Sequence, residues 1–224
     1  MPQRQEPFLN DNIYHVFNRT IEGKKIFQNS KYSSLFLDTM SYYFSTGLEM
    51  SYSKFKRLDD KKQNLLLKNL KKAKDYRVSV LAYCLMPTHF HMLLKQEKDN
   101  GIPRFISDTV NSFTRRYNLE NKRRGPLFLP KFKSTSISTD EQLIHVTRYI
   151  HLNPYSSGLV GNIYGIDIYP WSSFKEYTDG QDIICSTDYI LGMFNNNCNK
   201  YKEFVYDNAD YQKNLELLKY LDNW

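Results

Sequence analysis

Apolar and polar positions follow a two-residue period in some segments of the chain, which predicts β-strands. Met86-Pro87-Thr88 predicts a turn between two of these segments. Pro130 lies inside another, which predicts an edge strand, because proline cannot donate a hydrogen bond to a central ladder. The predicted strands are Ile13–Arg19, Val78–Leu85, His89 to near Asp99, and Leu127–Ser134.

Other segments repeat apolar residues at steps of three and four, which predicts amphipathic helices. Gly47, the pair Gly125-Pro126 and Pro154 are the expected helix ends. Ser138 and Glu141 form a capping-box pair at the start of the last of these helices. The predicted helices are Lys31 to Thr46, Asp59 to Lys74, Ile102 to about Arg124, and Ser138 to Asn153.

The predicted strand at His89 is the most informative stretch. His89 and His91 are two residues apart, so in a strand both face one side, while Phe90, Met92 and Leu94 face the other. Two imidazoles side by side on a rigid strand can bind a metal ion. His15 could be a third ligand, although a lone strand histidine is more often structural.

The helix from Ser138 carries a polar stripe as well as an apolar face. Gln142, His145, Tyr149 and Asn153 lie on one side of that helix. Such a stripe is either the solvent side or a side that carries chemistry. Periodicity alone leaves both interpretations open.

The chain of 224 residues is long enough for one substantial domain or one domain with an appendage. Its net charge of +7 favours an anionic partner such as nucleic acid or an acidic membrane surface. Basic residues interleaved with 18 tyrosines suit single-stranded nucleic acid, and a solvated basic surface is the alternative. The candidate phosphate contacts are Arg115, Arg116, Arg123, Arg124, Lys131 and Lys133.

The three cysteines, Cys84, Cys185 and Cys198, are widely spaced and predict neither a zinc-type pair nor a disulfide framework. No apolar run is long enough to span a bilayer, and residues 1–12 contain no apolar signal core. We therefore expect a cytoplasmic protein with no membrane partner.

Several short motifs occur in a specific order along most of the chain. Together they resemble the single-tyrosine HUH transposases, in particular the REP-associated tyrosine transposases among the IS200-like transposases, over roughly residues 10–180. The motifs are Tyr14-His15-Val16, Met86 to Leu93, Tyr149 to Pro154, Gly158-Leu159-Val160, Tyr169 to Ser173, and Tyr177.

The resemblance implies an α+β domain with a ferredoxin-like antiparallel sheet and helices packed on it, over residues 1–180. Residues 48–76 would be a helical insertion, and 181–224 a C-terminal helical extension. That extension begins with a cap at Ser186-Thr187-Asp188 and ends in an amphipathic helix with Leu215, Leu218 and Leu221.

The resemblance also implies roles for site residues. His89 and His91 match the metal ligands, and Tyr149 matches the nucleophile. Asn153 occupies the position of a third polar ligand that is frequently glutamine, and the shorter asparagine would ligate directly or through water. Mg²⁺ or Mn²⁺ is the family's metal, while ligand preference alone also allows Zn²⁺ or Ni²⁺.

The implied reaction is cleavage of single-stranded DNA near hairpins through a 5′-phosphotyrosine intermediate, followed by strand transfer. Some members act as dimers that exchange the tyrosine helix and others as monomers, so a homodimer stays open. Two alternatives remain: a non-catalytic, domesticated hairpin-binding protein on the same scaffold, and a metal-dependent phosphodiesterase that uses water. Retention of both histidines and Tyr149 favours the transposase, because a binding protein needs none of them.

Overall fold

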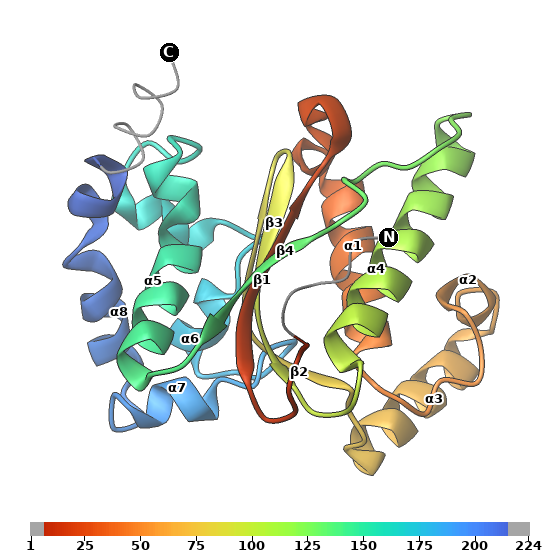
Figure 1. Cartoon of the computed structure of the whole chain (residues 1–224), viewed down its shortest axis with the longest axis horizontal. Coiled ribbons are helices and arrows are strands. Elements are labelled where there is room, and N and C mark those ends of the chain that lie inside the picture. Colours follow the sequence, from red (N-terminus) through yellow and green to blue (C-terminus); the bar gives the residue numbers. More distant parts are fainter. Residues whose placement is uncertain (1–6, 215–224) are drawn as a thin grey trace.

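An antiparallel sheet lies at the centre of the computed structural model, which describes residues 7–214 (Figure 1). The strand order within this part of the chain is β2-β3-β1-β4. Helices separate β1 from β2 and β3 from β4, so order and connectivity are those of a ferredoxin-like fold and confirm the expected class. The strands are β1 (Ile13–Arg19), β2 (Val78–Met86), β3 (His89–Gln96) and β4 (Lys133–Ile137).

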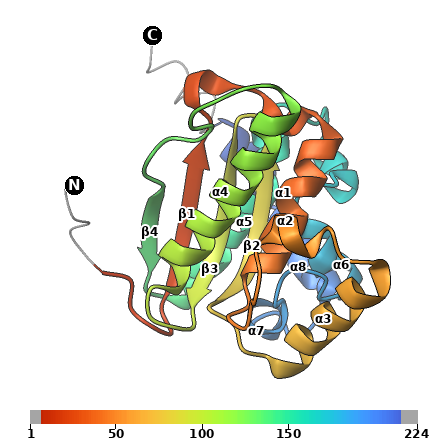
Figure 2. The same ribbon diagram turned by 90° about the vertical axis from the view of Figure 1, so that its right-hand side faces the viewer.

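Helices cover both faces of the sheet (Figures 1 and 2). One face carries α1 (Ser30–Tyr43) and α4 (Gly101–Glu120), with α2 (Tyr52–Phe55) and α3 (Asp60–Ala73) beyond them. The opposite face carries α5 (Asp140–Ser156), α6 (Phe174–Asp179), α7 (Asp188–Gly192) and α8 (Cys198–Tyr206). Short 3₁₀ turns are η1 (Ile21–Gly23), η2 (Ile26–Gln28) and η3 (Ile163–Ile168).

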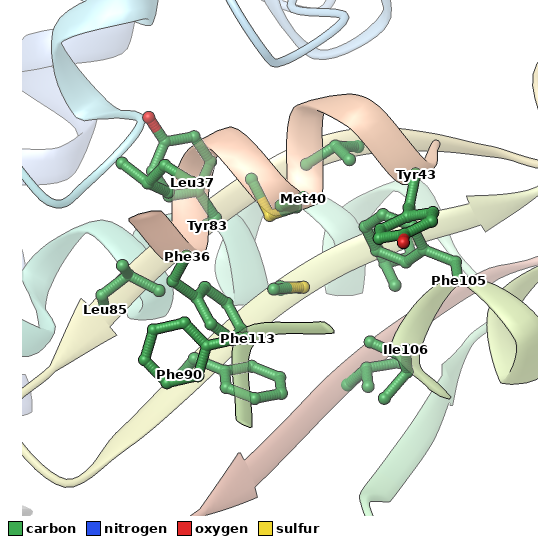
Figure 3. Close-up of a cluster of buried hydrophobic side chains, with 14 of the residues drawn as sticks. Phe36, Leu37, Met40, Tyr43, Tyr83, Leu85, Phe90, Phe105, Ile106 and Phe113 are labelled. Atoms are coloured by element: carbon green, nitrogen blue, oxygen red, sulfur yellow. The ribbon is translucent and has the colours of Figure 1, made fainter. Parts of the chain in front are cut away.

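The alternation of β3 divides the interior into two cores. Phe90, Met92 and Leu94 are fully buried against α1 and α4, in the cluster shown in Figure 3. Leu93 points the other way, into a second core with α5, α6 and α8. Since both faces of the strand are covered, its side-chain register is strongly specified.

The segment between α1 and β2 contains the exposed helix that the sequence predicts. Asp59 caps α3 by accepting a hydrogen bond from the backbone N–H of Lys62, and α3 has no buried residue. Its basic face is therefore a solvent face.

The predicted strand at Leu127–Ser134 is wrong by several residues, since β4 begins at Lys133. Leu127 and Phe128 are buried in the α1–α4 core, and the bridge of Phe128 to Thr20 is an isolated one outside the named strands. Their apolar character reflects insertion of the loop into that core. Because β1 lies between β3 and β4, β4 is an edge strand, as β2 is on the other side of the sheet.

Both predicted ends of α5 also need correction. The cap is Thr139, whose Oγ1 accepts from the N–H of Gln142, while Gln142 Oε1 accepts from the N–H of Ser138. The cap is thus one residue later than Ser138, and the side chain that reaches back is Gln142, which bonds the residue before the cap. Pro154 lies inside the helix, which continues to Ser156, so neither the N–H that the proline lacks nor its ring stops the last turn.

Residues after Gly180 pack against α5 and α6. Tyr201 is fully buried, and its hydroxyl lies 2.7 Å from Nδ1 of His151 on α5. The Glu176 carboxylate on α6 accepts three backbone hydrogen bonds from residues 183–185, which holds the start of this segment in place. The predicted final helix, with Leu215, Leu218 and Leu221, lies outside the described residues.

All three cysteines are free, and Cys84 is buried, as its apolar strand predicts. Within residues 7–214, no helix combines the length and the apolar character that a membrane crossing needs.

Gly101 gives a test of the packing at the start of α4. A Cβ added at Gly101 would overlap the backbone carbonyl of Arg77, whereas one added at Gly192 of α7 would meet nothing. We expect Gly101→Ala to lower the free energy of unfolding by about 1–3 kcal/mol through overpacking. Gly192→Ala should change it by less than about 0.5 kcal/mol. Urea unfolding measures both, and equal midpoints for the two variants would contradict the close approach.

Candidate active site

His89 and His91 stand on the face of β3 that looks toward α5. Their ring centroids are 5.1 Å apart with the planes nearly perpendicular. His89 follows the turn after β2 and its Nδ1 lies 3.0 Å from Oγ1 of Thr88. His91 is buried, whereas His89 is partly exposed, so the pair opens toward solvent at His89.

Tyr149 of α5 lies against these histidines. Its ring centroid is 5.7 Å from that of His91 and 6.0 Å from that of His15, both in edge-on arrangements. Leu143 and Ile150 anchor α5 on the sheet through the second core, and this packing brings Tyr149 over β3 and β1. The fold thus assembles a tyrosine and histidines that are far apart in the sequence.

His15, on β1, is in direct contact with His91. Its Nε2 lies 2.9 Å from Nδ1 of His91. Burial lowers the pKa of His15 to about 4, and burial, with His89 and His15 beside it, holds the pKa of His91 well below its usual range. Both imidazoles are therefore neutral at pH 7, the form that can ligate a metal.

Asn153 is buried one turn after Tyr149. Its Nδ2 donates a 2.9 Å hydrogen bond to the backbone carbonyl of Tyr149, which ties the amide to the helix that carries the tyrosine. The other two residues of the predicted polar stripe, Gln142 and His145, lie away from the histidine pair in their contacts. Gln142 serves the helix cap, and His145 is exposed, 2.7 Å from Arg148.

The described residues contain no group of three or more His, Cys, Asp or Glu side chains arranged to hold a metal. The donor set that the sequence predicts has only two such side chains, His89 and His91, and its third donor is the Asn153 amide. Neutral His91 and a carboxamide fit a divalent cation that completes its shell with water and phosphate oxygens. The residues present therefore fit such an ion.

The predicted basic residues lie in different environments. Arg116 pairs with Glu120 at 2.6 Å, and the guanidinium of Arg123 donates to the carbonyls of Gly125 and Pro126, so both stabilise the end of α4. Arg115 lies on α4, on the sheet face opposite Tyr149 (Figure 1). Arg124 and Lys131 are exposed in the connection from α4 to β4.

Lys133 is the predicted basic residue that shares the histidine face. In the register, Lys133 of β4 lies opposite Phe17 of β1, and Phe17 lies opposite His91 of β3. Directly opposed residues project from the same face of a sheet. Lys133 therefore lies on the same face as Phe17 and His91, at the β4 edge of the sheet.

Arg19 is a residue that the sequence interpretation missed. It pairs directly with His89 in the β1–β3 register and is exposed. The alternation of Ile13–Arg19 was sufficient to find it, because it places Arg19 on the same face as His15. A guanidinium next to His89 is well suited to bind a phosphate.

Both the sequence and the fold of this chain are similar to those of known proteins. Residues 50–153 match the sequence model of a family described as "Transposase IS200 like". No curated protein matches the chain in sequence.

Two solved structures are similar. One is described as a REP-associated tyrosine transposase bound to a REP hairpin. It is 16% identical, with a TM-score of 0.55, over 80% of this chain and 86% of that one, so the fold is shared. A provisionally named transposase of Deinococcus radiodurans is 14% identical, with a TM-score of 0.36, over 66% and 95%.

The two arginines near the end of α4 provide a matched test of their structural roles. Arg123→Ala removes hydrogen bonds to the connection after α4, whereas Arg115 is exposed with no such bonds to that connection. We expect Arg123→Ala to lower the free energy of unfolding by about 1–2 kcal/mol. Arg115→Ala should stay within about 0.5 kcal/mol of the parent. Chemical denaturation of both variants tests this, and an unchanged midpoint for Arg123→Ala would show that its bonds contribute nothing.

Proposed function

We propose that this protein cleaves and rejoins single-stranded DNA beside hairpins with Tyr149 as nucleophile, because residues 50–153 match the sequence model of the IS200-like transposases. That match by itself supports a transposase-like DNA-processing protein. The proposed reaction rests on the placement of the Tyr149 ring against His91, beside the predicted HUH pair. A hairpin-binding protein would need no such arrangement.

The residues around Tyr149 have separate tasks in the proposed reaction. His89, His91 and Asn153 would hold Mg²⁺ or Mn²⁺. When bound, that ion would polarise a non-bridging oxygen of the scissile phosphate. Asn153 also links the ligand set to the tyrosine, since its amide is bonded to the Tyr149 carbonyl.

The proposed chemistry is one exchange of phosphate esters. The Tyr149 oxygen forms a bond to phosphorus, the bond from phosphorus to the 3′ oxygen breaks, and the phenolic proton is balanced by protonation of that 3′ oxygen. The product is a 5′-phosphotyrosine and a free 3′-hydroxyl. Because one phosphodiester replaces another, the covalent intermediate allows rejoining to a new 3′-hydroxyl without ATP.

DNA would reach the site across the exposed end of the histidine face. Arg19 lies beside His89 and Lys133 lies at the β4 edge, both on this face. These two cations are suited to hold phosphates on either side of the scissile one. A hairpin as the neighbouring feature is supported by the hairpin-bound transposase that shares the fold.

One described chain contains the complete set of proposed residues, with α5 packed on its own sheet. We therefore propose that the site works within one chain. The homodimer with exchanged tyrosine helices is the alternative.

Replacing the nucleophile tests the reaction class. With Mg²⁺ or Mn²⁺ and 3′-labelled single-stranded DNA carrying hairpins from the gene's own flanks, we expect a covalent protein–DNA adduct on a denaturing gel. Tyr149→Phe should lower its formation by on the order of 1,000-fold or more, as loss of a nucleophile does. Tyr164→Phe, a change at an exposed tyrosine, should leave it unchanged.

The other outcomes identify the alternatives. Cleavage without an adduct that survives Tyr149→Phe would indicate water as the nucleophile. Hairpin binding without cleavage by the parent protein would indicate the non-catalytic binder. Adduct formation that persists after chelation of the metal with EDTA would contradict the role of the ion.

Two further variants test the DNA path. Arg19→Ala and Lys133→Ala should each weaken binding of single-stranded DNA and reduce the slope of log affinity against log salt by roughly 0.7 for each phosphate that is no longer neutralised. Lys68→Ala on α3 is the control, since α3 lies beyond the opposite sheet face. Fluorescence anisotropy across a salt series measures this. Equal slopes for all three variants would exclude the proposed path.

A further inference from the structure

The contact between His15 and His91 constrains more than the packing of two rings. The imidazoles are nearly parallel, with centroids 5.1 Å apart and an interplanar angle of 23°, and Nε2 of His15 lies 2.9 Å from Nδ1 of His91. This distance is that of a normal nitrogen hydrogen bond, so one of these two nitrogens donates and the other accepts. Both rings come from neighbouring strands of a rigid sheet.

The contact uses one of the two nitrogens of His91 and leaves only Nε2 for any other partner. A neutral imidazole carries a proton on one nitrogen and a lone pair on the other. If His15 donates, His91 must carry its proton on Nε2, which then offers no lone pair. If His15 accepts, the proton of His91 lies on Nδ1, and Nε2 is free to ligate.

We propose that His15 is a positioning residue that accepts the Nδ1–H of His91 and so orients the Nε2 lone pair of His91 for the cation of the DNA-cleaving site. The inference rests on the proposed function, because it assigns His91 as a ligand. It also requires that His15 carry its own proton on Nδ1. An outer partner of this kind fixes both the tautomer and the ring orientation of a ligating histidine.

The position of His15 in the sheet supports this role over simple packing. His15 lies opposite Leu93 in the register, one step along the same face from Phe17, which is opposite His91. An apolar ring at position 15 would fill the same space beside Tyr149 and Phe17. Only a side chain with an acceptor can also hold the proton of His91 on Nδ1.

Nitrogen-15 NMR of the full chain without metal or DNA tests the tautomers directly. We expect the neutral signature with the proton on Nδ1 for both His15 and His91, assigned with the aid of His15→Gln and His91→Gln. A proton on Nε2 of His91 would overturn the proposal. This measurement does not involve DNA cleavage, so it separates failure of the inference from failure of the proposed function.

Binding of Mn²⁺ to the same protein, measured by titration calorimetry or electron paramagnetic resonance, tests the consequence. His15→Phe keeps a ring but removes the acceptor, and we expect it to weaken Mn²⁺ binding by about 10- to 100-fold. His15→Gln restores an acceptor and should recover most of that affinity. Equal affinity in His15→Phe and the parent, or no recovery in His15→Gln with both variants folded by circular dichroism, would overturn the positioning role.

The adduct assay separates the proposed cleavage reaction from the positioning role of His15. If the parent forms no adduct but His15 and His91 have the expected tautomers and His15→Phe loses Mn²⁺ binding, the proposed reaction fails and the positioning role stands. If the parent forms the adduct and His15→Phe retains both Mn²⁺ affinity and activity, the reaction stands and His15 has only a packing role.

Discussion

Burial of β3 on both of its faces is the constraint on which the site depends. On one face, Phe90 and Met92 pack into the core under α1 and α4. On the other, Leu93 joins the core under α5. A shift of one residue would bring His91 into the aromatic core and leave Phe90 beside Tyr149. The free-energy cost of burying polar groups without partners excludes that register, so the apolar residues of this strand determine where its histidines point.

The second constraint is the fixed position of α5, because a nucleophile must approach its phosphate from a defined direction. The segment after Gly180 contributes to this through several contacts with α5. The Tyr201 hydroxyl meets His151, Arg148 lies over the ring of Phe204, and the Tyr155 hydroxyl donates to Asp210. Gln212 also donates to the backbone carbonyl of Tyr149 itself. These bonds hold the proposed nucleophile from the side that faces away from the sheet.

The basic side chains of this protein lie in places with different roles. Arg116 pairs with Glu120, and Arg123 donates to the carbonyl of Pro126, so both stabilise the C-terminal end of α4. The lysines of α3 are on a helix with no buried residue. Arg19 and Lys133 share the face of the sheet with the histidines. The net charge of +7 therefore indicates an anionic partner in general, while strand register indicates which cations can meet it at the site.

The sequence by itself predicted three features. Local periodicity placed His89 and His91 on one face of a strand and predicted the exposed helix α3. The ordered motifs implied the ferredoxin-like class. It misplaced β4, because Leu127 and Phe128 have the apolar character of a strand but fill a core between distant helices. It misjudged Pro154, because a proline does not always end a helix, and this one tolerates the missing N–H and continues to Ser156. The contact of His15 with His91, the approach of Tyr149 and the place of Arg19 beside His89 depended on how β1, β3 and α5 pack together. Such contacts join residues far apart in the chain, and no local pattern specifies the pairing of strands or the docking of a helix.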